Sequence, residues 1–315
     1  MRPPLPLPRL SLLLLLLAGI ALSLPAPSRA EDSKKDQNAL SEQLAQKLQE
    51  LVSSGKSLAS DTLLAALEKP SPAPVAWIEP NQTLLRPREI AKRARLAYVR
   101  VGWIYQCTRC SRWHQALAGG YAVDPQTIAT ARHVLEYPKN AKPNSGLPVV
   151  LRGEDELLPI TAILASDPAH DSALVRLGCN HLQPLPLQSH IEVGDSVFCL
   201  SDPQGNRSIF TSGIVNRISR TRSEHTAPEE DLFAPSANAS TLTVGADWAP
   251  GSSGAALLDE AGNCVGHVAT IQNIEGHRNS SASGSDNPKS AAPVVMSLHH
   301  AIPAARVRAL VPAGR

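Results

Sequence analysis

The sequence predicts a mostly β protein, a sandwich or a barrel, preceded by a short helical segment. Short apolar and β-branched runs alternate with turn signals from residue 97 to residue 271, a pattern typical of all-β folds. The 27 prolines and 19 glycines favour turns over a helical bundle. We therefore expect strands at these segments: Ala97–Ile104, Gly120–Val123, Thr127–Thr130, Val149–Arg152, Ile160–Leu164, Ala173–Leu177, Ser196–Leu200, Ile209–Ile218, Thr241–Val244, Ala255–Leu258 and Val265–Ile271.

The composition is that of a globular protein with little net charge. The chain has 315 residues, of which 43% are hydrophobic and 18% charged, enough for one large or two small domains. Its formal charge is +2, which is far from the strongly basic balance of a nucleic-acid-binding protein. We therefore expect no nucleic-acid partner.

Residues 1–30 have the pattern of a secretory signal peptide. Two arginines lie in a proline-rich start, an apolar run follows from Leu10 to Leu24, and Ser28-Arg29-Ala30 places small residues at the −3 and −1 positions. The run is shorter than the roughly 20 residues that cross a bilayer. An uncleaved anchor is the alternative. The sequence predicts a secreted or periplasmic protein with no stable membrane span after cleavage.

Residues 31–75 are predicted to form a helical preface and a proline-rich linker. Four leucines recur at helical spacing within residues 35–54: Leu40, Leu44, Leu48 and Leu51. A second short helix fits residues 61–68, and three prolines at 70–74 then stiffen the chain. We expect this segment to pack on the main domain. The alternative is an inhibitory or docking arm.

Three residues from separate motifs could together perform acyl transfer. Ser253 lies in the turn Gly-Ser-Ser-Gly at 251–254, where glycines expose a hydroxyl and leave backbone N–H groups free to bind an oxyanion. Gly251 and Ser253 are the candidates for those N–H groups. His133 ends one apolar strand and Asp171 opens another. Together they supply a nucleophile, a base and the carboxylate that orients the base.

Four stretches resemble, in the same order along the chain, the trypsin-like serine peptidases of the chymotrypsin fold, and most closely their HtrA/Deg-like branch. They are AGGYAVDPQTIATARHV around His133, SDPAHDSALVRL around Asp171, VGDSVFCLSDPQGNRSIFTSGIVNRISR at 193–220, and ADWAPGSSGAALLDEAGNCVGHVAT around Ser253. The resemblance implies two six-stranded antiparallel β-barrels with the active site between them. It also implies a serine endopeptidase that acts on proteins or peptides without a cofactor.

The same resemblance implies how the chain divides. The first barrel would span 94–185 and carry His133 and Asp171, and the second would span 186–274 and carry Ser253. Residues 275–315 would form a polar loop and a closing helical segment. Because few residues follow Ile271, we expect no PDZ domain. The alternative function on this fold is a catalytically silent binding module. The oligomeric state is left open.

The resemblance suggests substrate-binding residues as well. Asp247 lies six residues before Ser253, where an acid at the base of the S1 pocket favours Lys or Arg in trypsin-like relatives. The alternative, which we favour, is a solvated loop aspartate. The strand Val268-Ala269-Thr270 is expected to line one wall of S1. His267 is one position out of register with the histidine of glutamate-selective relatives, so we expect it to be structural.

Two positions depart from the family pattern. Arg132 precedes the candidate base where small residues are usual, so its side chain either points to solvent or lowers the pKa of the His133 imidazole by charge repulsion. Ala255 stands where many relatives have a second glycine, and its methyl group is tolerable unless φ is positive.

The segment Cys107-Thr108-Arg109-Cys110, followed by His114, fits no part of the peptidase pattern. A C-x2-C pair with a histidine offers three zinc ligands, but no second pair of ligands is evident. In an oxidising compartment a disulfide between Cys107 and Cys110 is the simpler interpretation. We therefore predict no metal, and keep a zinc- or thiol-dependent adaptor built on these residues as an alternative.

Overall fold

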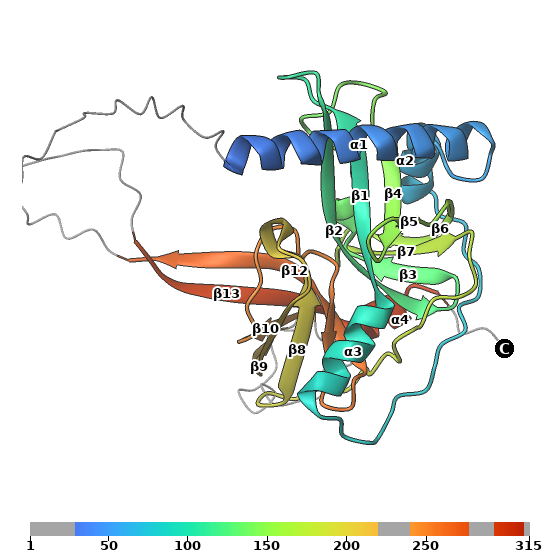
Figure 1. Cartoon of the computed structure of the whole chain (residues 1–315). Coiled ribbons are helices and arrows are strands. Elements are labelled where there is room, and N and C mark those ends of the chain that lie inside the picture. Colours follow the sequence, from blue (N-terminus) through green and yellow to red (C-terminus); the bar gives the residue numbers. More distant parts are fainter. Residues whose placement is uncertain (1–28, 220–239, 277–292, 312–315) are drawn as a thin grey trace, which may run out of the picture.

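The computed structural model describes residues 29–219, 240–276 and 293–311. In this part of the chain, two β units lie side by side, and the two N-terminal helices cover the first of them (Figure 1). No described helix combines the length and the apolarity that a membrane span requires. The apolar run of the predicted signal peptide lies outside the described residues, as do residues 277–292 of the polar loop expected after residue 274.

The first unit is an antiparallel sheet with the strand order β5-β4-β1-β2-β3-β7-β6. It is a seven-stranded half-barrel rather than the closed six-stranded barrel that the resemblance implied. The sheet curls until β4 and β6 contact each other, and it encloses a core that includes Trp103, Ile128 and Val175. Its strands are β1 (Tyr98–Gln106), β2 (Trp113–Asp124), β3 (Thr127–Thr130), β4 (Leu147–Arg152), β5 (Glu156–Leu157), β6 (Ile160–Asp167) and β7 (Ser172–Leu177).

The second unit is a closed barrel with the strand order β10-β13-β12-β11-β8-β9. This confirms the second six-stranded barrel of the expected fold. Its strands are β8 (Ser196–Ser201), β9 (Ile209–Ser219), β10 (Thr241–Val244), β11 (Ala256–Leu258), β12 (Cys264–Glu275) and β13 (Val294–Pro303). The expected end of this barrel at residue 274 is wrong, because β13 completes it by pairing with β10 and β12.

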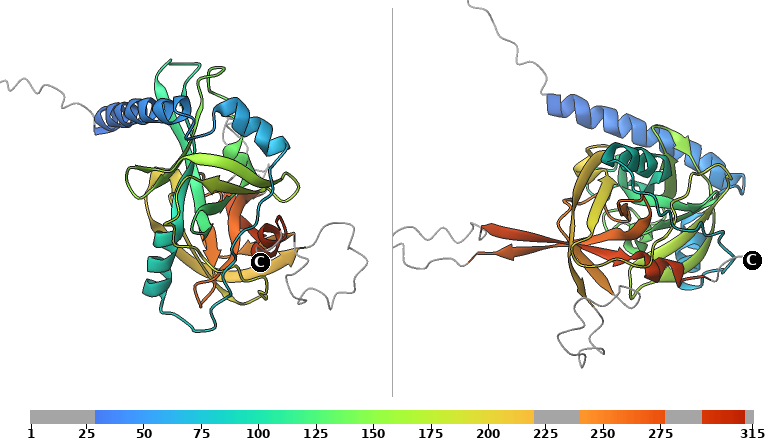
Figure 2. Two further views of the ribbon diagram at one scale, coloured as in Figure 1. Left: turned by 90° about the vertical axis from the view of Figure 1, so that its right-hand side faces the viewer. Right: turned by 90° about the horizontal axis from the view of Figure 1, so that it is seen from below.

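Strand β13 was not predicted, and its burial explains why. Its first half is exposed on both faces and projects with β12 beyond the barrel (Figure 2). Only the second half, from His299 to Pro303, enters the core. The strand therefore lacks the alternation of apolar and polar residues from which a half-buried strand is predicted.

Helices α1 (Arg29–Ser53) and α2 (Ser60–Glu68) cover the first unit (Figure 1). Leu44 and Leu48 of α1 pack against Ile104 and Leu151. In the same way, α2 buries its leucines in the core of the half-barrel. Each buried leucine contributes on the order of 1.5–3 kcal/mol to holding the helices there. The helical preface thus packs on the main domain.

A further helix, α3 (Pro87–Ala97), was not predicted. Pro87 begins it, and the Glu89 carboxylate accepts the backbone N–H of Arg86 at 3.0 Å, an arrangement that satisfies a helix N-terminus. Its buried face is only Ile90, Ala94 and Ala97. Two of these side chains are alanines, so the hydrophobic period in this arginine-rich segment is weak.

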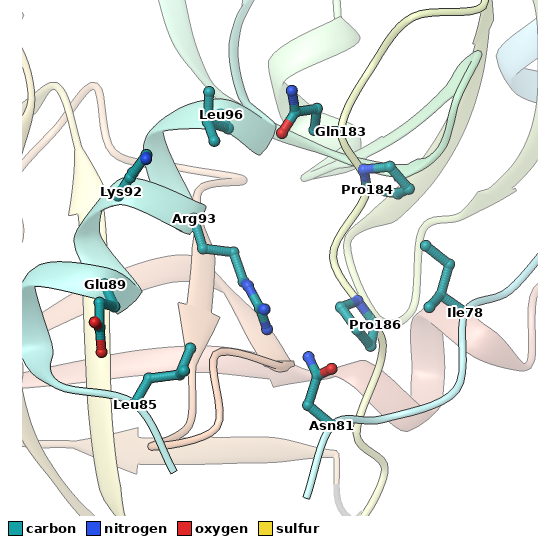
Figure 3. Close-up of a pocket in the computed structure, with 10 residues that line it drawn as sticks. All are labelled: Ile78, Asn81, Leu85, Glu89, Lys92, Arg93, Leu96, Gln183, Pro184 and Pro186. Atoms are coloured by element: carbon teal, nitrogen blue, oxygen red, sulfur yellow. The ribbon is translucent and has the colours of Figure 1, made fainter. Parts of the chain in front are cut away.

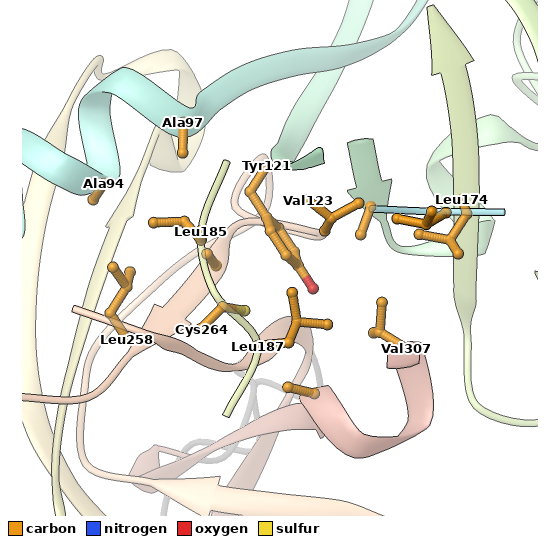
Figure 4. Close-up of a cluster of buried hydrophobic side chains, with 14 of the residues drawn as sticks. Ala94, Ala97, Tyr121, Val123, Leu174, Leu185, Leu187, Leu258, Cys264 and Val307 are labelled. Atoms are coloured by element: carbon orange, nitrogen blue, oxygen red, sulfur yellow. The ribbon is translucent and has the colours of Figure 1, made fainter. Parts of the chain in front are cut away.

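The two units share a core cluster (Figure 4). Tyr121 from the first unit, Leu258 from the second and Val307 from α4 (Ala304–Arg308) all belong to it. The connection between the units runs through this cluster, since Leu185 donates its N–H to the Ala122 carbonyl at 2.9 Å. Shared burial and main-chain hydrogen bonds therefore fix the two units against each other. α4 is the C-terminal helix that the fold class included.

Candidate active site

His133 and Asp171 are brought together at the ends of two neighbouring strands. A short 3-10 turn (η1, Arg132–Leu135) carries His133 after β3, and Asp171 precedes β7, which pairs with β3. Asp171 Oδ2 lies 2.6 Å from His133 Nδ1, and Oδ1 accepts the backbone N–H of His133 at 2.9 Å. An ionised Asp171 makes Nδ1 the donor, which leaves Nε2 able to act as a base.

This contact sets the charge state of both groups. The hydrogen bond that the imidazole donates to Asp171 raises the pKa of His133 and outweighs the opposite effect of burial. Burial opposes ionisation of Asp171, but hydrogen bonds from the His133 side chain and backbone hold the pKa of the carboxyl below its ordinary value. The pair therefore combines an ionised orienting group with an imidazole of increased proton affinity.

Arg132 does neither of the things expected from the sequence. Its side chain is only 13% exposed, and it forms ion pairs with Glu68 at 2.6 Å and with Glu136 at 2.7 Å. Because the two carboxylates neutralise the guanidinium, it does not lower the pKa of His133, which is raised. The residue instead joins α2, through Glu68, to the turn that carries His133.

The loop around Ser253 is built by backbone conformation. Gly251 and Gly254 have φ values of 101° and 76°, which favour glycine. Ser252 is buried, and its hydroxyl accepts a hydrogen bond from Ser201 at 2.9 Å. Ser253 is only half-buried. The glycine-enclosed turn thus buries the first serine and leaves the second accessible.

Two backbone N–H groups of this loop are unpaired. Within the ranges that the structure describes, the N–H groups of Gly251 and Ser253 donate to no acceptor, whereas those of Ser252 and Gly254 donate to carbonyls at 3.0 and 2.8 Å. The Ser253 hydroxyl also makes no hydrogen bond to a described residue, so none joins it to His133. Unpaired N–H groups beside a serine are what an oxyanion hole requires.

The Ser253 loop lies against the segment that leads to His133. Gly119 of β2 donates its N–H to the Ser253 carbonyl at 2.7 Å, and its own carbonyl accepts the Thr130 hydroxyl at 2.7 Å. A Cβ at Gly254 would stand 2.4 Å from Thr130 Oγ1 and 2.8 Å from the backbone nitrogen of Ala131. The serine loop of the second unit is therefore in contact with the chain immediately before His133.

His267 lies beneath the His133–Asp171 pair. It is fully buried on β12, and its Nε2 lies 3.3 Å from the Asp171 carbonyl oxygen. Burial lowers the pKa of His267 to about 4, so the ring is neutral near pH 7. A neutral ring that donates from Nε2 supports the backbone of Asp171, which is the structural use expected for it.

The candidate substrate-binding residues occupy different environments. The Asp247 side chain is 84% exposed and lies 3.9 Å from His299 Nδ1, which places it at the surface and not at the base of a pocket. Val268 is buried, Ala269 is half-buried and Thr270 is exposed. Sequence reasoning missed Trp248, whose indole N–H donates to the Thr270 carbonyl at 3.4 Å. Its position just before the serine loop was the sequence feature that could have identified it.

A groove beside Gly251 is also lined by the N-terminal helix, which sequence reasoning did not place near the site. Gly251 shares this groove with residues 115–118 of β2 and with Gln37 and Leu40 of α1. A separate pocket lies between α3 and the connection at 183–186 (Figure 3). None of His133, Asp171 and Ser253 lines that second pocket.

The Cys107–Cys110 pair does not form the disulfide that the sequence favoured. Both are free thiols, as are Cys179, Cys199 and Cys264. Cys107, Cys110 and His114 lie together, with one donor atom from each within 4.8 Å of the others. They surround the turn between β1 and β2.

One family model and two solved structures are similar to parts of this chain. Residues 118–266 match the family model of the trypsin-like peptidase domain. Two solved structures are similar to the chain. The HtrA-type protease AlgW, an alanine variant with a tripeptide, has 20% identity and a TM-score of 0.46 over 70% of this chain and 60% of its own. Deg5 has 19% identity and a TM-score of 0.44 over 58% of this chain and 83% of its own.

The chain thus spans about 60% of the length of the AlgW structure. No curated protein matches the sequence. The family match covers the segments that carry the acyl-transfer residues and most of the strands of both units. The chain therefore contains a trypsin-like peptidase domain, and His133, Asp171 and Ser253 all lie within it.

Proposed function

We propose that the protein is a secreted or periplasmic serine endopeptidase that cleaves peptide bonds through Ser253, His133 and Asp171. The observation that carries the proposal is the 2.6 Å hydrogen bond between Asp171 Oδ2 and His133 Nδ1. It orients the imidazole and leaves Nε2 as the base. Assignment to the HtrA/Deg-like branch rests on the sequence motifs and stays a prediction.

The reaction follows from the roles of these groups. The Ser253 hydroxyl attacks the carbonyl carbon of the substrate while His133 Nε2 takes its proton. The negative oxygen of the tetrahedral intermediate accepts hydrogen bonds from the N–H groups of Gly251 and Ser253. The C–N bond then breaks, His133 returns the proton to the leaving amine, and water hydrolyses the acyl-enzyme by the same steps.

The proposal requires the Ser253 hydroxyl to come within hydrogen-bond reach of His133 Nε2. Such contacts are often long in free enzymes and tighten when substrate binds. The approach is supported by the half-buried position of Ser253 and by Gly119, which donates its N–H to the Ser253 carbonyl and accepts the hydroxyl of Thr130, just before His133. No metal or organic cofactor takes part in these steps.

The proposed location depends on the N-terminal segment. Cleavage after Ala30 would remove the apolar run, and α1, which begins at Arg29, would remain almost whole. N-terminal sequencing of the protein exported by its host tests this part. A mature chain that begins at Glu31 is expected, and a chain that keeps the apolar run would contradict export by cleavage.

Covalent labelling with a fluorophosphonate tests the catalytic assignment. The reagent should attach to the peptide that contains residues 251–254, and the Ser253→Ala variant should take up no label. The matched control is Ser252→Ala, because the Ser252 hydroxyl is buried and already bonded to Ser201. That variant should keep the label if its melting temperature shows that it folds. Labelling of folded Ser253→Ala would contradict the assignment of Ser253 as the nucleophile, whereas no labelling of the natural chain would favour the silent binding module.

A further inference from the structure

A cysteine pair and a histidine lie together at the turn between β1 and β2. Cys107 follows β1, Cys110 lies in the turn, and His114 is the second residue of β2. The donor atoms of the three residues lie within 4.8 Å of one another. The closest pair is Cys110 Sγ and His114 Nε2, at 3.0 Å. Neither sulfur is held in a disulfide.

The backbone of the turn holds these donors in place. The N–H of Cys107 donates to the Arg112 carbonyl at 3.0 Å, and the N–H of Ser111 donates to the Cys107 carbonyl at 3.0 Å. In addition, the N–H of Arg109 points at Cys107 Sγ, at 3.4 Å. The turn therefore presents both sulfurs and the imidazole to one point.

The distances fit a zinc ion. Zinc binds cysteine sulfur at about 2.3 Å and histidine nitrogen at about 2.0–2.1 Å, so ligand atoms in a tetrahedral site are about 3.5–3.8 Å apart. Cys110 Sγ and His114 Nε2 lie 3.0 Å apart, and all three donor atoms lie within 4.8 Å of one another, limits that enclose this spacing. Cys110 is exposed and His114 is half-buried, so an ion can reach them from solvent.

We propose that Cys107, Cys110 and His114 form a zinc site. Thiolate and imidazole ligands favour zinc over magnesium or calcium. Among the described residues no fourth His, Cys, Asp or Glu joins the group, so the fourth position takes water or a small ligand from solution. Binding converts two thiols to thiolates and releases two protons to solvent.

The site would order one end of the first unit. His114 and Trp113 line a depression whose other wall is α1, through Gln37, Asn38 and Ser41. The turn is also tied to the chain beyond η1, because Thr108 donates its N–H to the Asn140 carbonyl at 2.9 Å. A bound zinc ion therefore fixes the turn beneath the N-terminal helix. Hydrogen exchange of residues 107–115 should slow when zinc is added.

Metal titration of the full chain tests the proposal. The protein is purified with reductant, freed of metal, and titrated with Zn²⁺ against a chromophoric chelator and separately with Co²⁺. One ion per chain is expected, with the thiolate-to-cobalt charge-transfer band of a four-coordinate site. Cys110→Ser and His114→Asn should each lose this stoichiometric binding. The matched control is Cys179→Ser, because Cys179 is also a free cysteine and only half-buried, and it should bind zinc normally.

Three results would overturn the site. One is absence of zinc binding by the folded chain, and another is binding that survives in both ligand variants. The third is a thiol count, after denaturation of the protein as its host makes it, that falls two short of the five cysteines and maps to a bond between Cys107 and Cys110. All these readouts measure binding or thiols, so loss of peptidase activity in the labelling experiment leaves them unchanged.

Discussion

The two halves of the candidate active site are built by different means. On the first unit, side-chain and backbone hydrogen bonds at 2.6 and 2.9 Å hold His133 to Asp171, and His267 supports the Asp171 backbone from below. On the second unit, the Ser253 side chain has no hydrogen-bond partner among the described residues, and its loop is shaped by glycines with positive φ. The candidate base, His133, is held by Asp171, whereas the candidate nucleophile, Ser253, is placed by the main chain of its loop.

This difference predicts two kinds of sensitivity. Changes on the first unit should alter proton affinity and therefore the pH dependence of activity. Changes on the second unit should alter the position of the hydroxyl and of the N–H groups, and so lower activity at every pH. The following variants test this division, from the largest expected effect to the smallest.

Asp171→Asn should have the largest effect. Loss of the carboxylate removes the group that orients the imidazole, and kcat/KM should fall by about 10⁴. The remaining activity should also change its pH profile. The base must be neutral, so activity falls as pH drops through the raised pKa of His133. Without the carboxylate that pKa is lower, and the acidic limb should move to lower pH. If the acidic limb of the kcat/KM profile stays at the same pH, the assignment of His133 as a base oriented by Asp171 is wrong.

Gly254→Ala should have the next largest effect. Gly254 has a φ of +76°, and its new Cβ would meet the Gly119 carbonyl and Thr130 Oγ1, both at 2.4 Å. Displacement of the loop should cost about 10²–10³ in kcat, as loss of an oxyanion donor does, with no shift of the acidic limb. Gly194→Ala is the matched control, because its φ is +98° but nothing lies within 4 Å. Equal losses in the two variants would mean that backbone strain, and not the contact with the His133 segment, causes the effect.

His267→Gln should change how the free energy of unfolding depends on pH. The folded pKa of His267 is about 4, below the ordinary value of about 6.5, so the unfolded chain binds the proton more readily. Its contribution to stability is complete above about pH 6.5 and is lost as pH falls toward 4, by about 3 kcal/mol. Glutamine does not titrate. Between pH 7 and pH 4 the free energy of unfolding of the variant, measured in urea, should therefore fall by about 3 kcal/mol less than that of the natural protein. If the free energy of unfolding falls equally in both proteins, protonation of His267 does not cause the loss of stability.

Glu68→Gln should have the smallest effect. Its ion pair with Arg132 is exposed on the glutamate side, at 73%, and such pairs contribute about 0–1 kcal/mol. We expect a small decrease in melting temperature and a change of less than about twofold in kcat/KM, since Glu136 still pairs with Arg132. A large loss of activity would show instead that α2 positions the His133 turn.

The sequence was most informative where local pattern and chemistry coincide. His133 follows a buried strand and Asp171 precedes another, and adjacent antiparallel strands bring such ends together, so the pair was predictable. Apart from the two-residue β5, the strands of the first unit and the first five of the second lie at or near the expected segments. These strands could be predicted from the sequence because their apolar residues form the core of the units to which the strands belong.

The rest depended on contacts that no local pattern encodes. The exposed half of β13 and the small buried face of α3 gave no usable period. The partners of Arg132 include Glu68, which is remote in sequence, so its neutralisation could not be foreseen. The approach of α1 to Gly251 likewise depends on how a separate helix packs on β2.

Gly119 has a consequence for how the protein tolerates mutation. It touches the serine loop through its N–H and the strand before His133 through its carbonyl, and a Cβ there would stand 2.7–2.9 Å from Ala255. The main chain of Gly119, together with the Thr130 hydroxyl, therefore links the Ser253 loop to the strand before His133. A saturation library selected for proteolysis should accept many residues across the surrounding cores, yet admit only glycine at position 119.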